Sequence, residues 1–189
     1  MTDLDLTTLF DQGLAYEAFL DKYANASQRE RWDKVHANVS LDESQQSLLG
    51  SFVRSMKVFV SAGAWCGDCI NQCPIFDHFG QRCDRIEVRY FDRDDHPDLA
   101  DAIRTCGGRR VPSVLFVSED NQVCGRYGDR TISTYRHLVA TQLGPSCPTG
   151  FGDVNQTLLD DVTDDWLREF ERIQWMLRLS PRLREKHGD

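Results

Sequence analysis

The sequence contains no apolar run that approaches the ~20 residues needed to span a bilayer, which excludes a membrane-spanning helix. Basic residues are also few, because 22 Lys and Arg stand against 30 Asp and Glu, a formal net charge of −8. That balance argues against nucleic acid and anionic membrane surfaces as partners. Internal repeats, low-complexity segments, a phosphate-binding loop and a serine-hydrolase motif are absent as well.

The first residues, Met1–Asp5, are acidic and lack the basic region and the apolar core of a secretory signal. We therefore expect a cytoplasmic protein. Structural disulfides are rare in that compartment, so closely spaced cysteines there are more typical of catalysis or metal binding. At 189 residues, the chain is long enough for one sizeable core.

Two of the seven cysteines are separated by two residues and follow a short apolar run, Val58–Ala62. The run predicts a buried strand, and the stretch after the cysteines predicts a helix. The cysteines thus fall at a strand-to-helix junction, where the free N–H groups and the dipole of the first turn favour a thiolate. Cys66 is expected to be the exposed nucleophile, and Cys69, one turn further in, the second thiol of a redox pair.

The residues around this pair resemble the active site of the thioredoxin family. The motif consists of Trp65, Cys66, Gly67, Asp68 and Cys69, with aspartate where thioredoxins usually carry proline. Pro74 matches the proline that kinks the active-site helix of the family. Val111-Pro112 matches the loop with the cis-proline, and Gly128 the glycine after the last strand. The aspartate and the helical N-terminal segment are similar to a bacterial subfamily of thioredoxin-like proteins.

This resemblance implies an α/β fold of the thioredoxin type, with a central mixed sheet of about four strands flanked by helices. The hydrophobic pattern agrees, since it predicts strands over residues 58–61, 86–91, 113–117 and 122–127 and helices over 69–83, 98–105 and 131–143. The helix between the first two strands predicts that they run parallel. The short spacer between the last two predicts an antiparallel hairpin.

Helical patterns flank this central region on both sides. Three are predicted before residue 56, and the third opens with a capping-box sequence at Ser40–Glu43 and continues to Val53. After a linker over residues 144–150, apolar residues recur at three- and four-residue steps, which predicts one amphipathic helix over 155–179. Its apolar stripe either docks on the same molecule or forms a dimer or partner surface. We expect one globular unit made of residues 1–55, 56–143 and 144–189.

Thiol–disulfide exchange is the activity that the resemblance implies. Cys66 would attack a disulfide of a protein or small molecule, and Cys69 would resolve the mixed disulfide. No cofactor is required, and the sequence leaves open whether thioredoxin reductase, glutathione or neither would supply the electrons. The supporting residues would be Trp65 as an apolar wall, Gly67 at the tight turn, and Val111 and cis-Pro112, whose backbone would hold an extended substrate.

Two departures from the family pattern bear on the chemistry. Asp68 disfavours a second negative charge on Cys66, so we predict a higher Cys66 pKa than with proline or histidine at position 68, and hence a reductant. The alternative is that Asp68 points to water and has little effect. Val60 stands where thioredoxins carry a buried aspartate proposed to take the resolving thiol's proton. That proton would instead pass to water or to Asp68.

Arg109 and Arg110 directly precede Val111-Pro112 and are expected on the cysteine face. They would favour the thiolate or bind an anionic substrate such as glutathione or a peptide carboxylate, unless they are solvated loop residues. Cys73 and Cys106 are either auxiliary redox thiols or small hydrophobic residues of the core.

Two other functions remain open. The chain could be a non-catalytic binding or adaptor module that presents the Pro112 loop and its end helices to a partner. It could also be a thiolate metal carrier, because Cys66, Cys69 and Cys73 would lie on one helix face, with His78 or Cys106 as a fourth ligand. We favour the oxidoreductase without a bound metal. The sequence does not determine the oligomeric state.

Overall fold

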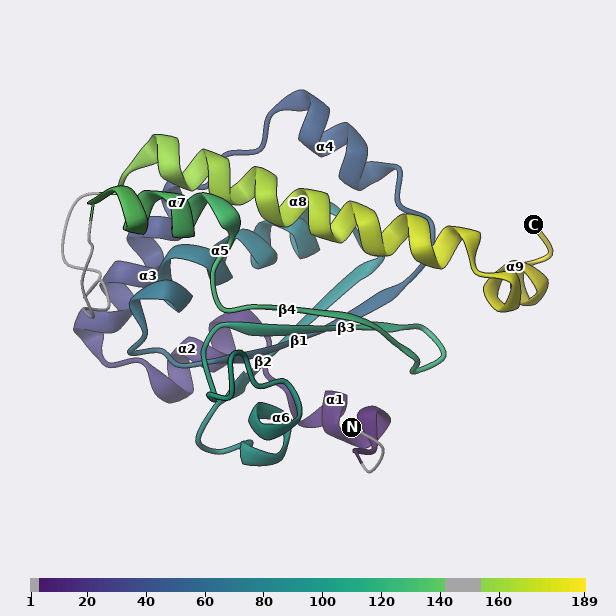
Figure 1. The fold of residues 1–189 in the computed structure, drawn as a ribbon, viewed down its shortest axis with the longest axis horizontal. Coiled ribbons are helices and arrows are strands. Elements are labelled where there is room, and N and C mark those ends of the chain that lie inside the picture. Colours follow the sequence, from purple (N-terminus) through teal and green to yellow (C-terminus); the bar gives the residue numbers. More distant parts are fainter. Residues whose placement is uncertain (1–3, 142–153) are drawn as a thin grey trace.

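Four strands form the central sheet in the computed structural model, which describes residues 4–141 and 154–189 (Figure 1). They are β1 (Met56–Ala62), β2 (Ile86–Asp92), β3 (Ser113–Ser118) and β4 (Val123–Gly128), in the order β2-β1-β3-β4. β1 and β2 run parallel, whereas β3 is antiparallel to both β1 and β4. The predicted mixed sheet is confirmed. The predicted linker over residues 144–150 lies outside the described residues.

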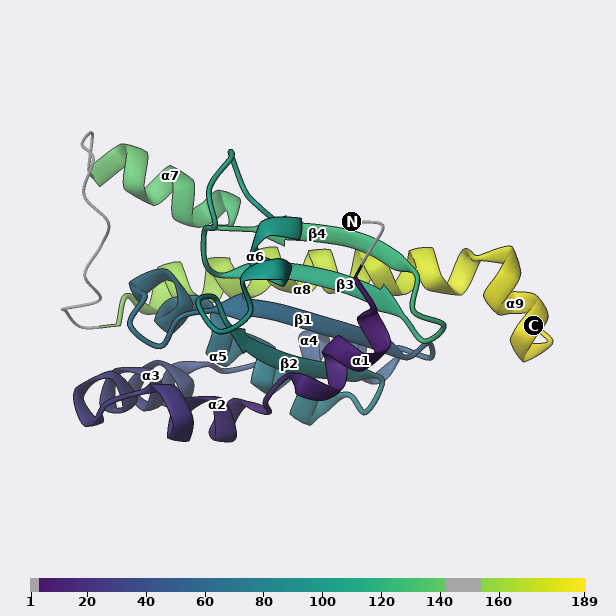
Figure 2. The same ribbon diagram turned by 90° about the horizontal axis from the view of Figure 1, so that it is seen from below.

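Helices cover both faces of this sheet. They are α1 (Leu6–Gln12), α2 (Tyr16–Tyr23), α3 (Ala26–Asn38), α4 (Glu43–Gly50), α5 (Gly67–Arg82), α6 (Pro97–Ala102), α7 (Ile132–Thr141), α8 (Gln156–Leu179) and α9 (Pro181–His187). Figures 1 and 2 show α5 and α8 on one face and α1 and α6 on the other. Within the described ranges, none of these helices has the length and apolar character needed to cross a bilayer.

Strand β1 is buried on both faces because successive side chains of a strand point to opposite sides. Val58 and Val60 belong to the larger core, which α5, α8 and the N-terminal helices α2 to α4 complete. Phe59 belongs to a smaller core on the other face, where it packs against Phe10 of α1. The N-terminal helices therefore share the core of the sheet.

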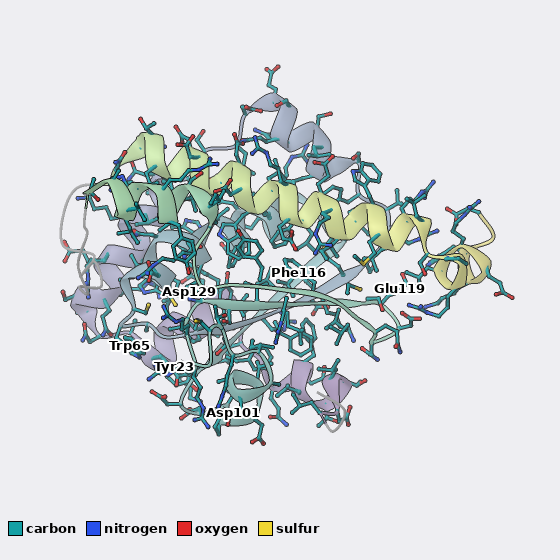
Figure 3. All side chains as sticks on the ribbon, viewed as in Figure 1. Tyr23, Trp65, Asp101, Phe116, Glu119 and Asp129 are labelled. Carbon is teal, nitrogen blue, oxygen red and sulfur yellow. The ribbon has the colours of Figure 1, made fainter. Side chains whose placement is uncertain are left out.

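The apolar stripe of α8 is buried within the chain. The Trp166 ring lies 4.6 Å from that of Phe76 in α5, and the Phe170 ring lies 5.1 Å from that of Phe116 in β3. Figure 3 shows Phe116 beneath α8. The predicted helix is confirmed, and its stripe docks on the same molecule.

Two helices, α4 and α6, have ends that differ from the prediction. Helix α4 begins at Glu43 because Asp42 and Gln45 form the capping box, in which each side chain accepts from the backbone N–H of the other. It ends at Gly50, short of Val53. Helix α6 ends at Ala102, and the chain then makes a tight turn in which the backbones of Thr105 and Gly108 exchange two hydrogen bonds of 3.0 Å.

The docking of α8 predicts the effect of one core substitution. Phe170→Ala is expected to lower the free energy of unfolding by about 3–5 kcal/mol, because it removes a fully buried ring that contacts α5 and β3. Urea unfolding measures the loss. The control Leu179→Ala, at a side chain on the same helix that is 72% exposed, should change it by less than about 0.5 kcal/mol. Equal effects would contradict this docking.

Candidate active site

The cysteine pair lies where β1 leads into α5. Cys66 is the N-cap residue of α5, and Cys69 lies in its first turn. A backbone hydrogen bond of 2.9 Å from Cys66 N–H to Gly63 O closes the turn between strand and helix. Both thiols are free. The predicted strand-to-helix junction is therefore present, and it places Cys66 at the positive end of the helix dipole.

Cys66 is less exposed than the sequence analysis expected. Only 6% of the residue is accessible, and Cys69 is fully buried. The expectation of an exposed nucleophile is wrong because the loop before β3 packs over it. The Cys66 thiol donates to the carbonyl oxygen of Val111, with 3.4 Å between sulfur and oxygen.

The loop over Cys66 contains the proline that the resemblance singled out. The Val111–Pro112 peptide bond is cis, and Val111 is itself buried. Gly128, at the end of β4, passes so close that a Cβ there would lie 2.8 Å from Pro112 O and 2.9 Å from Ser113 Oγ. A residue with a side chain would therefore separate these two loops.

Both thiols of the pair are hard to ionise in the dithiol state. The hydrogen bond shared with Cys69 and burial raise the pKa of Cys66, and the charge of Asp68 adds a smaller contribution in the same direction. Burial raises the pKa of Cys69. The charge of Asp68 raises the pKa of Cys66 as expected, but the main causes of the raised value are the partner thiol and burial. The comparison with proline or histidine at position 68 stays a prediction.

Asp68 does not point to water. Its buried carboxylate accepts from Arg130, with the Arg130 Nε 3.0 Å from both oxygens and Nη2 2.8 Å from Oδ2. Burial raises the pKa of Asp68, and Arg130 opposes that shift. Arg130 was not predicted as a site residue; the only signal near it is Gly128, two residues earlier, which matches the family's glycine after the last strand.

The two arginines before the proline are each held by a carboxylate. Arg109 Nε donates to Asp101 Oδ1 of α6 at 2.7 Å, and Arg110 Nη1 donates to Asp129 Oδ2 at 3.0 Å. An anionic substrate would have to compete with these aspartates. The role of Arg109 and Arg110 in anion binding stays a prediction.

Trp65 forms the exposed rim of the site. Its side chain is 48% exposed, and the guanidinium of Arg93 lies 4.7 Å from its ring centroid. In Figure 3, Trp65 and Asp129 lie at the same end of the sheet. Beside the buried sulfurs, the protein thus offers an accessible aromatic surface.

Behind Cys69, the space near Val60 is closed and apolar on the strand side. On the helix, one turn beyond Cys69, Cys73 is fully buried and helps to raise the pKa of Cys69. Cys106 is exposed, so it is not one of the small hydrophobic residues of the core.

The alternative of a thiolate metal site finds no fourth ligand at His78, which contacts the carbonyl oxygen of His36 at 3.0 Å rather than the sulfurs. Across the described residues, no group of three or more His, Cys, Asp or Glu side chains could hold a metal ion.

A mixed sheet that brings a Cys-x-x-Cys pair beside a cis-proline loop defines a thioredoxin-like α/β protein. The family model described as Thioredoxin matches residues 13–142, and the chain belongs to that family. The more specific resemblance to a bacterial subfamily stays a prediction.

Solved structures share this fold. A protein of unknown function, PA1234, from Pseudomonas aeruginosa superimposes with a TM-score of 0.69 at 18% identity, over 88% of this chain and 98% of that one. An HIV epitope-scaffold superimposes with a TM-score of 0.64, also at 18% identity, over 88% and 99% of the two chains. At such low identity, these similarities show the fold alone. No protein with a curated description matches the chain.

The raised pKa of Cys66 predicts how its alkylation depends on pH. Only the thiolate reacts with iodoacetamide, so the rate at Cys66 should be low at pH 7 and still rise above pH ~8.5, the usual pKa of a cysteine. Peptide mass spectrometry at a series of pH values measures this rate. The exposed Cys106 shows in the same sample that the reagent is active. A midpoint of Cys66 alkylation below about pH 8 would contradict the raised pKa of this thiol.

Proposed function

We propose that this protein is a thiol–disulfide oxidoreductase that acts as a reductant. The observation that carries the proposal is the position of the Cys66 sulfur, 3.4 Å from the Val111 carbonyl oxygen, with Cys69 in the first turn of the same helix. A nucleophilic thiol, a second thiol able to close a disulfide, and a backbone segment beside them are the parts that such exchange requires.

The proposed reaction proceeds in two exchanges. The Cys66 thiolate attacks one sulfur of a substrate disulfide, the substrate S–S bond breaks, and the other half leaves as a thiolate that takes up a proton. Cys69 then loses its proton and attacks the Cys66 sulfur, which releases the second substrate thiol and forms the Cys66–Cys69 disulfide. Two electrons pass from the protein to the substrate, and an external dithiol or glutathione must return them.

The raised pKa values of Cys66 and Cys69 support the direction of the reaction. A dithiol whose thiolates are poorly stabilised gives up its electrons more readily, because the disulfide is then the favoured state. A strong oxidant of this fold has the opposite property, a stabilised thiolate.

The substrate would approach over Trp65 and the Val111–Pro112 loop. We propose that it is a disulfide of a protein or small molecule in the cytoplasm, and that no cofactor takes part. Arg109 and Arg110 would contribute to binding only if a substrate anion displaced Asp101 or Asp129 from them.

Insulin reduction with dithiothreitol as electron donor tests the proposed activity. The protein should accelerate precipitation of the insulin chains, and Cys66→Ser should abolish the effect because it removes the attacking thiol. Cys124→Ser, at a partly exposed cysteine in the β3–β4 hairpin, is the matched control and should retain full activity.

A trapping variant complements this assay. Cys69→Ser should hold substrates on Cys66 as mixed disulfides that reducing agents release. Absence of both insulin reduction and trapped substrates would refute the oxidoreductase and favour a binding module.

The redox potential gives an independent prediction. Equilibration with glutathione buffers should give a value nearer to the roughly −270 mV of thioredoxin than to the roughly −120 mV of a strong oxidant. Mass spectrometry of the alkylated protein measures the reduced fraction. A redox potential near roughly −120 mV would show that the Cys66 thiolate is stabilised. That result would contradict the raised pKa of the buried Cys66 thiol.

A further inference from the structure

Asp68 places a carboxylate between the two redox cysteines, in the first turn of α5. Its side chain is only 7% exposed. A buried charge is strongly destabilising unless a counter-ion and hydrogen bonds compensate it. The fold must therefore supply such a partner at this position.

Arg130 supplies it from a distant part of the sequence. Its Nε lies 3.0 Å from each Asp68 oxygen and its Nη2 lies 2.8 Å from Oδ2, and its side chain is 16% exposed. Both carboxylate oxygens thus face one guanidinium, an arrangement stronger than a single-contact ion pair. Because both oxygens accept from Arg130, Asp68 is poorly placed to accept the proton of Cys69.

The loop that carries Arg130 is fixed to the active-site helix. The buried side chain of Gln72 donates to the backbone oxygens of Asp68, at 3.2 Å, and Asp129, at 3.0 Å. Its own oxygen accepts from the indole N–H of Trp166 in α8 at 3.0 Å. Helix α5, the loop after β4 and helix α8 therefore hold Asp68 and Arg130 in register.

The pair changes what Cys66 experiences. A lone carboxylate in this place would oppose a second negative charge on the neighbouring sulfur. A carboxylate with a guanidinium bound to both oxygens acts as a dipole instead, and its effect falls off more steeply with distance. The aspartate therefore adds only a small further obstacle to ionisation of Cys66.

We propose that Arg130 is a positioning residue for the thiol chemistry, which neutralises Asp68 and so limits how far this carboxylate opposes ionisation of Cys66. This inference rests on the proposed function, since it assigns a role in the same site. Arg130 does not react with the substrate; it acts through Asp68.

The alkylation profile of Cys66 tests the proposal in four proteins. Arg130→Met removes the group that lowers the pKa of Asp68. At the alkaline pH at which Cys66 ionises, Asp68 is then charged without a counter-ion, so the pH midpoint of Cys66 alkylation should rise by about one unit. Asp68→Asn leaves the guanidinium unbalanced, so the midpoint should fall below that of the unmodified protein. The double variant removes both charges and should return to near the original midpoint.

Matched controls separate this effect from a structural one. Arg172→Met breaks a comparable arginine–carboxylate pair, that with Glu169 on α8, and should leave the midpoint unchanged. Arg130→Lys should recover most of the shift, because it restores the positive charge. Arg130→Met could instead lower the free energy of unfolding and leave the alkylation midpoint within about 0.2 pH units of the original. That outcome would overturn the proposal.

Misfolding of Arg130→Met would leave Asp68→Asn as the deciding variant, and an unchanged midpoint there would also overturn the proposal. Alkylation reports ionisation of Cys66 without turnover, so the two proposals can fail separately. Insulin reduction with an unmoved midpoint would reject the role of Arg130 alone. A moved midpoint without disulfide reduction would reject the oxidoreductase alone.

Discussion

The register between β1 and β3 is the constraint on which the site depends. The strands are antiparallel neighbours, and Ser61 near the end of β1 pairs with Ser113 at the start of β3. The cysteine motif follows β1 and the proline loop precedes β3, so this pairing brings them to the same edge of the sheet. Contact between the Cys66 sulfur and the Val111 carbonyl is a consequence of that register. A shift by one residue would turn every side chain of the strand to the opposite face.

The elements that could be predicted are those with a local signal. Alternation and β-branched residues indicated all four strands, and the three- and four-residue steps of α8 indicated its length and its buried face. The helix ends were less accurate, since the cap at Asp42 depends on which of several polar residues bonds to Gln45. The burial of the Asp68 side chain could not be predicted, because its partner Arg130 lies 62 residues further along the chain. Burial of Cys66 was missed for the same reason, as its cover comes from the Val111 loop.

Arginines near the cysteines are paired with aspartates, although the chain as a whole has a formal net charge of −8. Each arginine near the cysteines has an aspartate beside it, and these pairs are Arg93–Asp94, Arg109–Asp101, Arg110–Asp129 and Arg130–Asp68. The two exposed pairs, Arg93–Asp94 and Arg109–Asp101, contribute little to stability, about 0–1 kcal/mol each. Their consequence is electrostatic, because a substrate of the proposed reaction would meet paired charges. Its selection would then depend on shape, the Trp65 ring and backbone groups.

The segments outside the central region also hold the site. From the N-terminal side, the buried indole N–H of Trp32 in α3 donates to Ala64 O, two residues before Cys66, at 2.9 Å. From the C-terminal side, Trp166 in α8 donates to Gln72, which in turn bonds to the backbone of Asp68. Two tryptophans thus fix the motif from opposite ends of the sequence. A buried donor that loses its acceptor costs about 1–3 kcal/mol, so movement of the motif is resisted at both contacts. The flanking helices therefore help to fix the position of the cysteines, although these hydrogen bonds do not involve a sulfur atom.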